Sequence, residues 1–377
     1  MVKNKNNINN MIEENNYDVC IVGAGVTGLF LASKLLEAGL KVLIVESGSQ
    51  IGGQINLYKD KSVYNIPLIH EIKSCEIVKT IKKEMDCFNE SYKIKTEAFL
   101  REIVADGKHF VLKIEDNKNI ENDGDGEIKQ TICKCRYLVL AFGKGKLEMN
   151  KISAIVCDEN DEYSRKKILD DVILYDVKDE QKFKGKELII CGGGDSAIDW
   201  ACELEKIAKK ITIIHRRDID KPENPMFLHF KQLCEDGKIN SVTPYNIESV
   251  NVDNLDTCKN NRGKNIAVCA NIVNTFSHEK KQIVGDFMLV FYGFKTVKNS
   301  DMYVYTDIGV SVDKDCRIIV DEKNNKTSCD AVFAIGDCCV FDGKIDNIFM
   351  GFTDAMKCFY EICHCEHGKK DVYGHRK

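Results

Sequence analysis

Two stretches of the chain share one pattern of apolar and polar positions. The first begins with the apolar run YDVCIVG and ends with a second apolar run, LKVLIVE, that closes on Glu46. Between them Leu29, Ala32 and Leu35 recur at helical spacing, and Gly39 stands where a helix would end in a left-handed cap. Strands that are apolar at every position are buried on both faces, as in a parallel sheet covered by helices. The pattern over residues 17–46 therefore predicts a parallel strand–helix–strand unit.

The same order of elements returns at residues 187–217. There the chain reads ELIICG, DSAIDWACELEKIAK and ITIIHRR, which predicts strand, helix and strand. Between the two units we expect a helix over residues 71–88, strands at FVLKI and RYLVLAFG, and an exposed hairpin excursion in the polar run DNKNIENDGDGEIKQ. Further along, a strand is expected at FMLVFYGF and a closing helix from about Thr353 to Cys363.

This order predicts an α/β protein in which a second Rossmann-like domain is inserted into the first. We expect a disordered polar tail over residues 1–16, a first domain over residues 17–144 and 292–377, and the inserted domain over residues 145–291. The chain would cross between the domains near Gly143–Gly145 and near Tyr292–Gly293.

Composition narrows the class of protein. The 377 residues are 44% hydrophobic and 30% charged, which is enough for two buried cores. A net charge of −5 offers no general attraction to nucleic acid or acidic membranes, and no run approaches the ~20 apolar residues of a membrane span. Many of the 18 cysteines lie in apolar runs, and no secretory leader is evident. Free thiols and a cytoplasmic location are therefore expected.

The first unit carries a G-x-G-x-x-G loop between its strand and its helix. Gly23 allows the tight turn, Gly25 lets the backbone approach a pyrophosphate, and Gly28 lets the helix pack close to the strand. The pyrophosphate would lie at the helix N-terminus, where free N–H groups and the helix dipole favour anions. Glu46 would accept hydrogen bonds from an adenosine ribose and would repel a 2′-phosphate. The unit is thus predicted to bind FAD or NAD rather than NADP.

The second unit has a related loop, GGGDSA, but its second strand ends in His215, Arg216 and Arg217 instead of an acidic residue. Guanidinium groups match phosphate oxygens in both charge and geometry, so this pocket favours NADPH over NADH. The alternative is that both arginines are ordinary solvated charges, and Asp218 could pair with one of them.

One anionic and one cationic adenosine pocket in a single chain have a direct chemical use. FAD and NADPH can be stacked so that a hydride passes from the nicotinamide to the flavin, while the protein supplies position and electrostatics. No side chain needs to act as an acid or a base in that step.

At this point the chain resembles the flavin reductases of thioredoxin reductase type, and within them the ferredoxin–NADP reductases often called type 2. Four segments carry the resemblance, spread over most of residues 17–360: YDVCIVGAGVTGLFLASKLLEAGLKVLIVES, IGGQINLYKDKSVYNIP, GGGDSAIDWACELEKIAKKITIIHRRD and DAVFAIGDCCVFDGKIDNIFMGFTDA. The resemblance implies two dinucleotide-binding domains of the three-layer ββα type, and a homodimer.

The resemblance also implies roles for individual residues. Tyr58 would stack on the flavin ring, and Asp337 would hydrogen-bond the ribityl or pyrophosphate region of FAD. A helix starting within residues 351–355 would direct its positive end at the flavin, where reduced flavin carries negative charge. The full set of expected cofactor-binding residues is Gly23, Gly25, Thr27, Gly28, Glu46, Gly53, Gln54, Tyr58, Gly143, Gly336, Asp337 and Thr353 for FAD, and Gly192, Gly194, Asp195, Ser196, His215, Arg216 and Arg217 for NADPH.

Cysteine spacing argues against a dithiol relay. Where thioredoxin reductases carry a C-x-x-C, this chain reads ILYDVKDEQKFKGKELII, without cysteine. Cys358 and Cys363 lie on the predicted last helix, where side chains five positions apart point about 140° apart and cannot readily form a disulfide. Electrons would therefore leave the flavin directly, which favours a one-electron carrier, ferredoxin or flavodoxin.

Two other classes of function stay open at this point. One is another NADPH-dependent flavin reductase of the same fold, such as a thioredoxin reductase variant without its dithiol. The other is a non-catalytic FAD-binding NADPH sensor or scaffold.

The run CHCEH at residues 363–367 matches no familiar tetrahedral site, so no metal is expected. The chain ends in EHGKKDVYGHRK, where the resembling reductases carry a Ser/Thr-rich extension over the outer flavin face.

Overall fold

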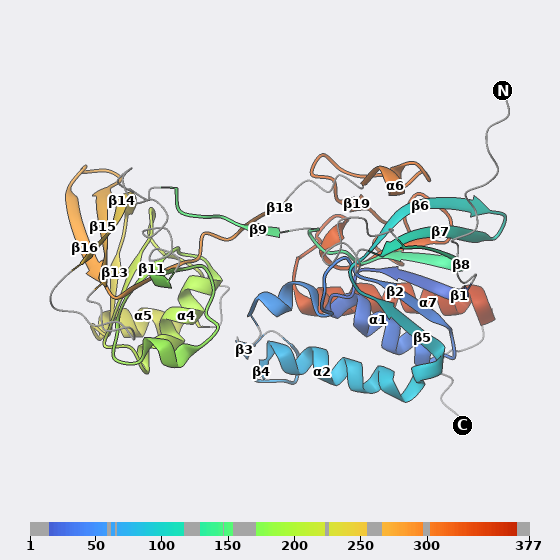
Figure 1. Cartoon of the computed structure of the whole chain (residues 1–377), viewed down its shortest axis with the longest axis horizontal. Coiled ribbons are helices and arrows are strands. Elements are labelled where there is room, and N and C mark those ends of the chain that lie inside the picture. Colours follow the sequence, from blue (N-terminus) through green and yellow to red (C-terminus); the bar gives the residue numbers. More distant parts are fainter. Residues whose placement is uncertain are drawn as a thin grey trace. The chain divides into compact units, whose positions relative to one another are not determined.

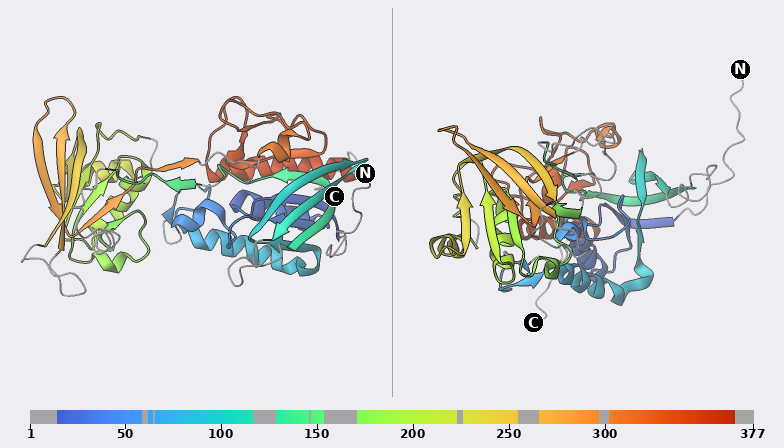
Figure 2. Two further views of the ribbon diagram at one scale, coloured as in Figure 1. Left: turned by 45° about the horizontal axis from the view of Figure 1, so that its top comes forward. Right: turned by 60° about the vertical axis from the view of Figure 1, so that its left-hand side comes forward.

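The computed structural model describes residues 15–58, 62–64, 66–116, 129–145, 147–153, 171–222, 226–254, 266–296 and 302–367. The chain forms two compact units (Figure 1, Figure 2). Unit 1 consists of Met1–Lys146 and Thr296–Lys377, and unit 2 of Leu147–Lys295, so unit 2 is an insertion into unit 1. The two crossings lie within a few residues of the expected ones. The hairpin excursion expected after residue 116 lies outside the described residues.

A sheet of seven described strands forms the centre of unit 1, in the order β5-β2-β1-β8-β7-β6, with β20 also paired to β8. Strand β1 pairs in parallel with β2 on one side and with β8 on the other, and β20 pairs in parallel with β8. Strand β7 is antiparallel to both β8 and β6. These strands are β1 Asn15–Val22, β2 Val42–Val45, β5 Tyr92–Lys95, β6 Ala98–Asp106, β7 His109–Asp116, β8 Lys129–Leu140 and β20 Val332–Ala334. The other elements are α1 Val26–Glu37, α2 Ser74–Met85, α6 Tyr303–Thr306, α7 Ile348–His367, 3-10 helices Gly53–Tyr58, Asp86–Ser91 and Gly336–Cys338, and short strands β3 Ser62–Val63, β4 Ile72–Lys73, β19 Ile318–Ile319 and β21 Cys339–Val340.

Both faces of this sheet are buried, which explains its uninterrupted apolar strands. Ile21 and Ile44 pack on the face covered by α1, α2 and α7 (Figure 1). Cys20 and Leu43 point to the opposite face and pack with residues of β6, β7 and α6. The predicted parallel strand–helix–strand unit is confirmed, because β1 and β2 pair in parallel on either side of α1.

The ends of two elements differ in how well the sequence predicted them. The cap at Gly39 is confirmed: its φ is 80°, and its N–H donates to Leu36 O at 2.9 Å just beyond α1. The expected polar tail over residues 1–16 is wrong at its end, because β1 already begins at Asn15. The backbone of Asn15 and Asn16 pairs there with β8, and residues 1–14 lie outside the described part of the chain.

Unit 2 is built around a parallel sheet in the order β10-β17-β11-β12-β13, beside an antiparallel sheet β14-β15-β16. The predicted second strand–helix–strand unit is confirmed, because β11 and β12 pair in parallel on either side of α4. The elements of unit 2 are β9 Leu147–Met149, β10 Ile173–Leu174, a 3-10 helix Glu180–Phe183, β11 Glu187–Cys191, α4 Asp195–Glu205, β12 Lys210–Ile214, α5 Phe227–Glu235, β13 Ile239–Val242, β14 Tyr245–Asn254, β15 Ile266–Asn274, β16 Lys280–Gly285, β17 Phe287–Val290 and β18 Phe294–Thr296. Among the described helices of the chain, none is long and apolar enough to cross a membrane.

Trp200, the only tryptophan, provides a test of the core of unit 2. It is buried on α4, and its indole Nε1 has no hydrogen-bond partner among the described atoms. Trp200→Phe should therefore cost about 1–2 kcal/mol of unfolding free energy, and Trp200→Ala about 3–5 kcal/mol, because only the second opens a large cavity. Urea unfolding followed by far-UV circular dichroism measures both. A cost of Trp200→Phe above about 3 kcal/mol would mean that the indole N–H has a partner, because phenylalanine would then lose a hydrogen bond as well as volume.

The cysteines give a second test, of burial. Every cysteine that the structure describes is a free thiol. Burial raises the pKa of Cys20 and Cys358 well above the usual value for a thiol, whereas Cys87, Cys316 and Cys365 are exposed. Iodoacetamide at pH 8 should therefore label the three exposed cysteines in the native protein and the two buried ones only in denaturant, as read by mass spectrometry. Native labelling of Cys358 would contradict the packing of α7.

Candidate functional site

The glycine loop of unit 1 joins β1 to α1 at the carboxyl edge of the sheet. Gly23 has a φ of 107°, and a Cβ there would lie 2.4 Å from Ala141 O. A Cβ on Gly28 would lie 2.4 Å from Gly23 O, so glycine is required where α1 packs on the loop. Gly25 precedes α1 without a side-chain cap, and no atom lies within 4 Å of where its Cβ would be. The uncapped N–H groups of α1 therefore face a cradle suited to an anion.

A second loop lies against this cradle. Gly52 N–H donates to Ala24 O at 2.7 Å, and a Cβ on Gly53 would lie 3.0 Å from the Cα of Gly25. Asn56 holds the loop in place, because its Nδ2 donates to Ile51 O at 2.6 Å. Nothing in the local sequence pattern singles out Asn56, because its role depends on a hydrogen bond that it forms back to Ile51 in the folded loop.

Glu46 lies at the end of β2, and both of its carboxylate oxygens accept backbone hydrogen bonds. Ala24 N–H donates to Oε2 and Gly48 N–H donates to Oε1, each at 2.7 Å. Glu46 thus helps to hold the glycine loop, a role that sequence reasoning did not assign. Oε1 also accepts from the Ser47 hydroxyl at 3.4 Å, whereas Oε2 keeps a further lone pair that can accept from a ribose hydroxyl.

A third loop, after β8, completes this edge. Gly143 has a φ of 61°, and a Cβ there would lie 3.7 Å from Nε2 of Gln54. Gln54 and Gly143, both expected at the cofactor, are thus brought together from positions far apart in the sequence. The backbone of Tyr58 ends the 3-10 helix Gly53–Tyr58, but its side chain, expected to stack on the flavin, lies outside the described residues.

Thr27 joins α1 to two segments from the far end of the chain. A Cβ on Gly336 would lie 3.2 Å from Thr27 Oγ1, and a Cβ on Gly351 would lie 2.4 Å from the same oxygen. The absence of both β-carbons therefore lets the turn after β20 and the first turn of α7 pack directly on the start of α1. This convergence brings together Gly336 and Thr27, two of the residues expected to bind FAD.

Asp337 follows Gly336 with its side chain 25% exposed. Burial raises the pKa of its carboxyl group, and Asp346 raises it further. Lys144 opposes this shift, with its Nζ 4.0 Å from Asp337 and 3.3 Å from Asp346. A half-buried carboxylate beside a lysine is suited to accept a hydrogen bond from a ligand hydroxyl. Lys144 and Asp346 were not among the predicted site residues.

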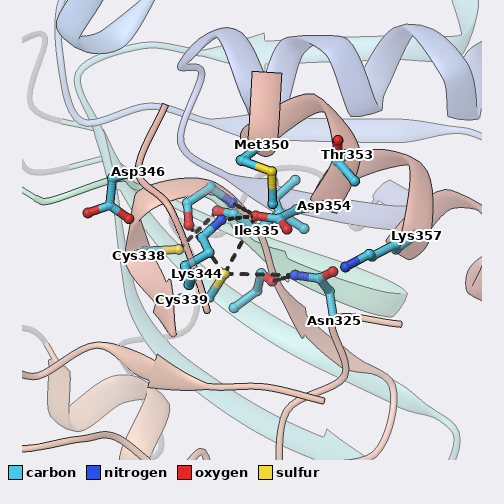
Figure 3. Close-up of polar contacts among 12 residues, drawn as sticks. Asn325, Ile335, Cys338, Cys339, Lys344, Asp346, Met350, Thr353, Asp354 and Lys357 are labelled. Atoms are coloured by element: carbon cyan, nitrogen blue, oxygen red, sulfur yellow. Dashed lines mark hydrogen bonds and ion pairs between the residues drawn. The ribbon is translucent and has the colours of Figure 1, made fainter. Parts of the chain in front are cut away.

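The last helix corrects a prediction. We expected a helix starting within residues 351–355, but α7 begins at Ile348 because Asn347 caps it: Met350 N–H donates to Asn347 Oδ1 at 2.7 Å. The asparagine was the signal that the sequence analysis missed. Thr353 consequently lies in the second turn of α7 (Figure 3). Its hydroxyl donates to Phe349 O at 3.1 Å instead of capping the helix.

The glycine loop of unit 2 repeats the first one. Gly192 has a φ of 136°, and a Cβ there would lie 2.4 Å from Phe291 O. Gly194 precedes α4 without a side-chain cap, and no atom lies within 4 Å of its would-be Cβ. Asp195 and Ser196 form the first turn of α4 behind it. The loop follows β11 and packs against the end of the neighbouring strand β17. The strand order of the sheet reverses at this pair of strands, which is where ligands of such folds bind.

The basic pocket lies beside this loop. A Cβ on Gly193 would lie 2.5 Å from Cδ2 of His215, so the imidazole ring packs directly on the loop. Burial lowers the pKa of His215, and the charges of Arg217 and Arg216 lower it further. Both arginines are exposed. Asp218 accepts a hydrogen bond from Thr243 Oγ1 at 3.1 Å, and no ion pair joins Asp218 to either arginine within the described ranges.

Comparison with known proteins identifies the family. The sequence model of the pyridine nucleotide-disulphide oxidoreductase family matches residues 17–357. The chain is 30% identical over 341 residues to a protein named ferredoxin–NADP reductase from Rickettsia bellii (strain OSU 85-389), covering 90% of this chain and 91% of that protein. It is 31% identical over 356 residues to a protein of the same name from Wolbachia pipientis wMel, covering 92% and 93%.

Solved structures confirm the fold. The crystal structure of T. acidophilum thioredoxin reductase matches with a TM-score of 0.65 at 20% identity, covering 94% of this chain and 99% of that chain. This likeness bears out the predicted α/β class with two Rossmann-like units. The family model, which matches most of the chain, shows that the chain belongs to the pyridine nucleotide-disulphide oxidoreductase family.

Proposed function

We propose that this protein is a ferredoxin–NADP reductase, which holds FAD in unit 1 and NADPH in unit 2 and passes electrons singly to ferredoxin or flavodoxin. One observation carries the proposal: each unit has an uncapped glycine loop at a helix start, and the two loops have side chains of opposite charge beside them. Glu46 lies beside the first loop, and Arg216 and Arg217 lie beside the second. The names of the relatives support the same activity.

The residues of unit 1 fit FAD. The cradle at Gly25 has room for a pyrophosphate, and a Cβ there would begin to fill that space. Glu46 would bind the adenosine ribose, and Asp337 would accept from a hydroxyl of the ribityl chain. Gly53, Gln54 and the start of α7 would line the flavin. FAD, once bound, supplies a ring that takes up a hydride and can release its electrons one at a time.

The residues of unit 2 fit NADPH. The loop at Gly194 would take the pyrophosphate, and Arg216 and Arg217 would bind the 2′-phosphate as charge-assisted donors. His215 has a lowered pKa, so its ring is neutral at pH 7 and packs on the loop without adding charge. Among the residues that the structure describes, neither arginine forms an ion pair that would have to break before the arginine binds phosphate.

The acceptor follows from the cysteines. Cys338 and Cys339 are neighbours beside Asp337, but burial raises the pKa of Cys338 to about 12, and both thiols donate to backbone carbonyl groups. Such thiols are poor nucleophiles and poor partners for an external disulfide. A one-electron carrier is therefore favoured over a disulfide substrate. We also propose a cytoplasmic location, in keeping with the free thiols, and a homodimer, as the resemblance implies.

The activity is tested with purified protein in two steps. The protein should be yellow, and NADPH should bleach the flavin band without oxygen. In steady state, reduction of ferredoxin or flavodoxin should then be supported by NADPH. A yellow protein whose flavin never bleaches would instead be a non-catalytic NADPH sensor, and turnover with thioredoxin but not with ferredoxin would indicate a disulfide reductase.

The cofactor preference is tested by replacing both arginines. Arg216→Ala with Arg217→Ala removes charge-assisted hydrogen bonds of about 1.5–3 kcal/mol each, so the KM for NADPH should rise at least about tenfold. The KM for NADH should change less than about twofold, because NADH has no 2′-phosphate. Initial rates over a range of each nucleotide measure both constants.

A matched control separates this effect from the loss of two positive charges. Lys280→Ala with Lys281→Ala makes the same change in net charge on β16, where both lysines pair with glutamates. That variant should keep the wild-type preference. Equal turnover of the unmodified protein with NADPH and NADH would contradict the role given to the arginines.

A further inference from the structure

A buried ion pair lies beneath the turn that carries Asp337. Lys344, with a side chain 2% exposed, pairs with Asp354, which is fully buried in α7 (Figure 3). Removing two charges from water is expensive, and a buried pair of this kind often contributes no more to stability than an apolar pair of the same volume. Its position next to the proposed FAD site therefore calls for a reason other than stability.

The contacts of Asp354 supply that reason. Its Oδ2 accepts a hydrogen bond from Gly336 N–H at 3.1 Å as well as the ion pair from Lys344. Its Oδ1 has no hydrogen-bond partner among the described atoms. Both contacts therefore involve Oδ2, which connects α7 to Gly336, the first residue of the turn Gly336–Cys338.

The turn depends on this acceptor. Gly336 has a φ of 73°, and its missing Cβ faces Thr27, so the turn is confined between α1 and α7. Its N–H is buried and would lack a partner without Asp354, a cost of about 1–3 kcal/mol for an unsatisfied group. Relief of that cost requires the peptide to rotate, and rotation would move Asp337, the next residue. Lys344 acts on the same residue, because its charge lowers the pKa of Asp337.

We propose that Asp354 is a positioning residue for FAD: paired with Lys344, it accepts from the Gly336 N–H and thereby fixes the direction of the Asp337 carboxylate. This inference rests on the FAD site proposed above. Lys344 compensates the buried charge, and the hydrogen bond from Gly336 transmits its effect to the site. FAD affinity should therefore depend on an acceptor at position 354, and not on the ion pair as such.

Two double variants separate the acceptor from the charge. Lys344→Met with Asp354→Asn removes both charges but keeps an amide oxygen that can accept from Gly336 N–H. Lys344→Met with Asp354→Leu removes both charges and the acceptor while keeping the branching of the side chain at Cγ. Flavin is removed from each protein and from the wild type, and the Kd for FAD is measured by quenching of flavin fluorescence. Thermal unfolding of each flavin-free protein is the control for stability.

The Asn variant should bind FAD within about threefold of the wild-type Kd, because the turn keeps its acceptor. The Leu variant should bind at least about tenfold more weakly, equivalent to about 1.4 kcal/mol, because the Gly336 peptide rotates and turns Asp337 away. The same rotation relieves the cost of the lost acceptor, so its Tm should stay close to that of the Asn variant. Its bound flavin should also have a blurred visible absorption band, which reports a less ordered site.

Equal FAD affinity of the two double variants would overturn the inference and leave the pair a structural one. The same holds if loss of affinity simply follows loss of Tm across the variants. A wild-type protein that binds no FAD would overturn the proposed function, and this inference with it, whereas a wild type that binds FAD beside two equal variants would sink the positioning role alone.

Discussion

The close approach of backbone to backbone at the carboxyl edge of each parallel sheet is the constraint on which the rest of the structure depends. In unit 1 Gly23 packs on the carbonyl group of Ala141, and in unit 2 Gly192 packs on the carbonyl group of Phe291, with 2.4 Å between a would-be Cβ and the oxygen in each case. No side chain fits there, so the chain turns sharply into the next helix. The helix N–H groups are thereby directed at an open cradle instead of at a cap.

The two units use this common frame with opposite electrostatics. The carboxylate of Glu46 is held in place by two backbone N–H groups before any ligand arrives. The guanidinium groups of Arg216 and Arg217 lie beside a histidine whose pKa they lower. We propose that a 2′-phosphate would be repelled by Glu46 and attracted by Arg216 and Arg217, so that charge rather than shape would direct each dinucleotide to its own unit.

Packing of distant segments gives unit 1 a second level of organisation. Thr27 of α1 contacts both Gly336 and Gly351. Asp354 of α7 accepts a hydrogen bond from Gly336 N–H and so connects the turn that begins at Gly336 to α7. A buried polar group without a partner is costly, so these contacts restrict the turn Gly336–Cys338, which carries Asp337. The many cysteines fit around this arrangement as small buried side chains and leave direct electron transfer from the flavin as the proposed route.

Local features could be predicted from the sequence because their physical causes act within a few residues. Strand burial, helical spacing, the cap at Gly39 and the contrast between Glu46 and Arg216 all depend on neighbours in the chain. Even the start of α7 was readable from Asn347, had the cap been recognised. Only the tertiary structure decided which oxygen Gly336 N–H meets and that Glu46 braces the glycine loop. Such contacts join residues brought together by packing, and no periodicity in the sequence records them.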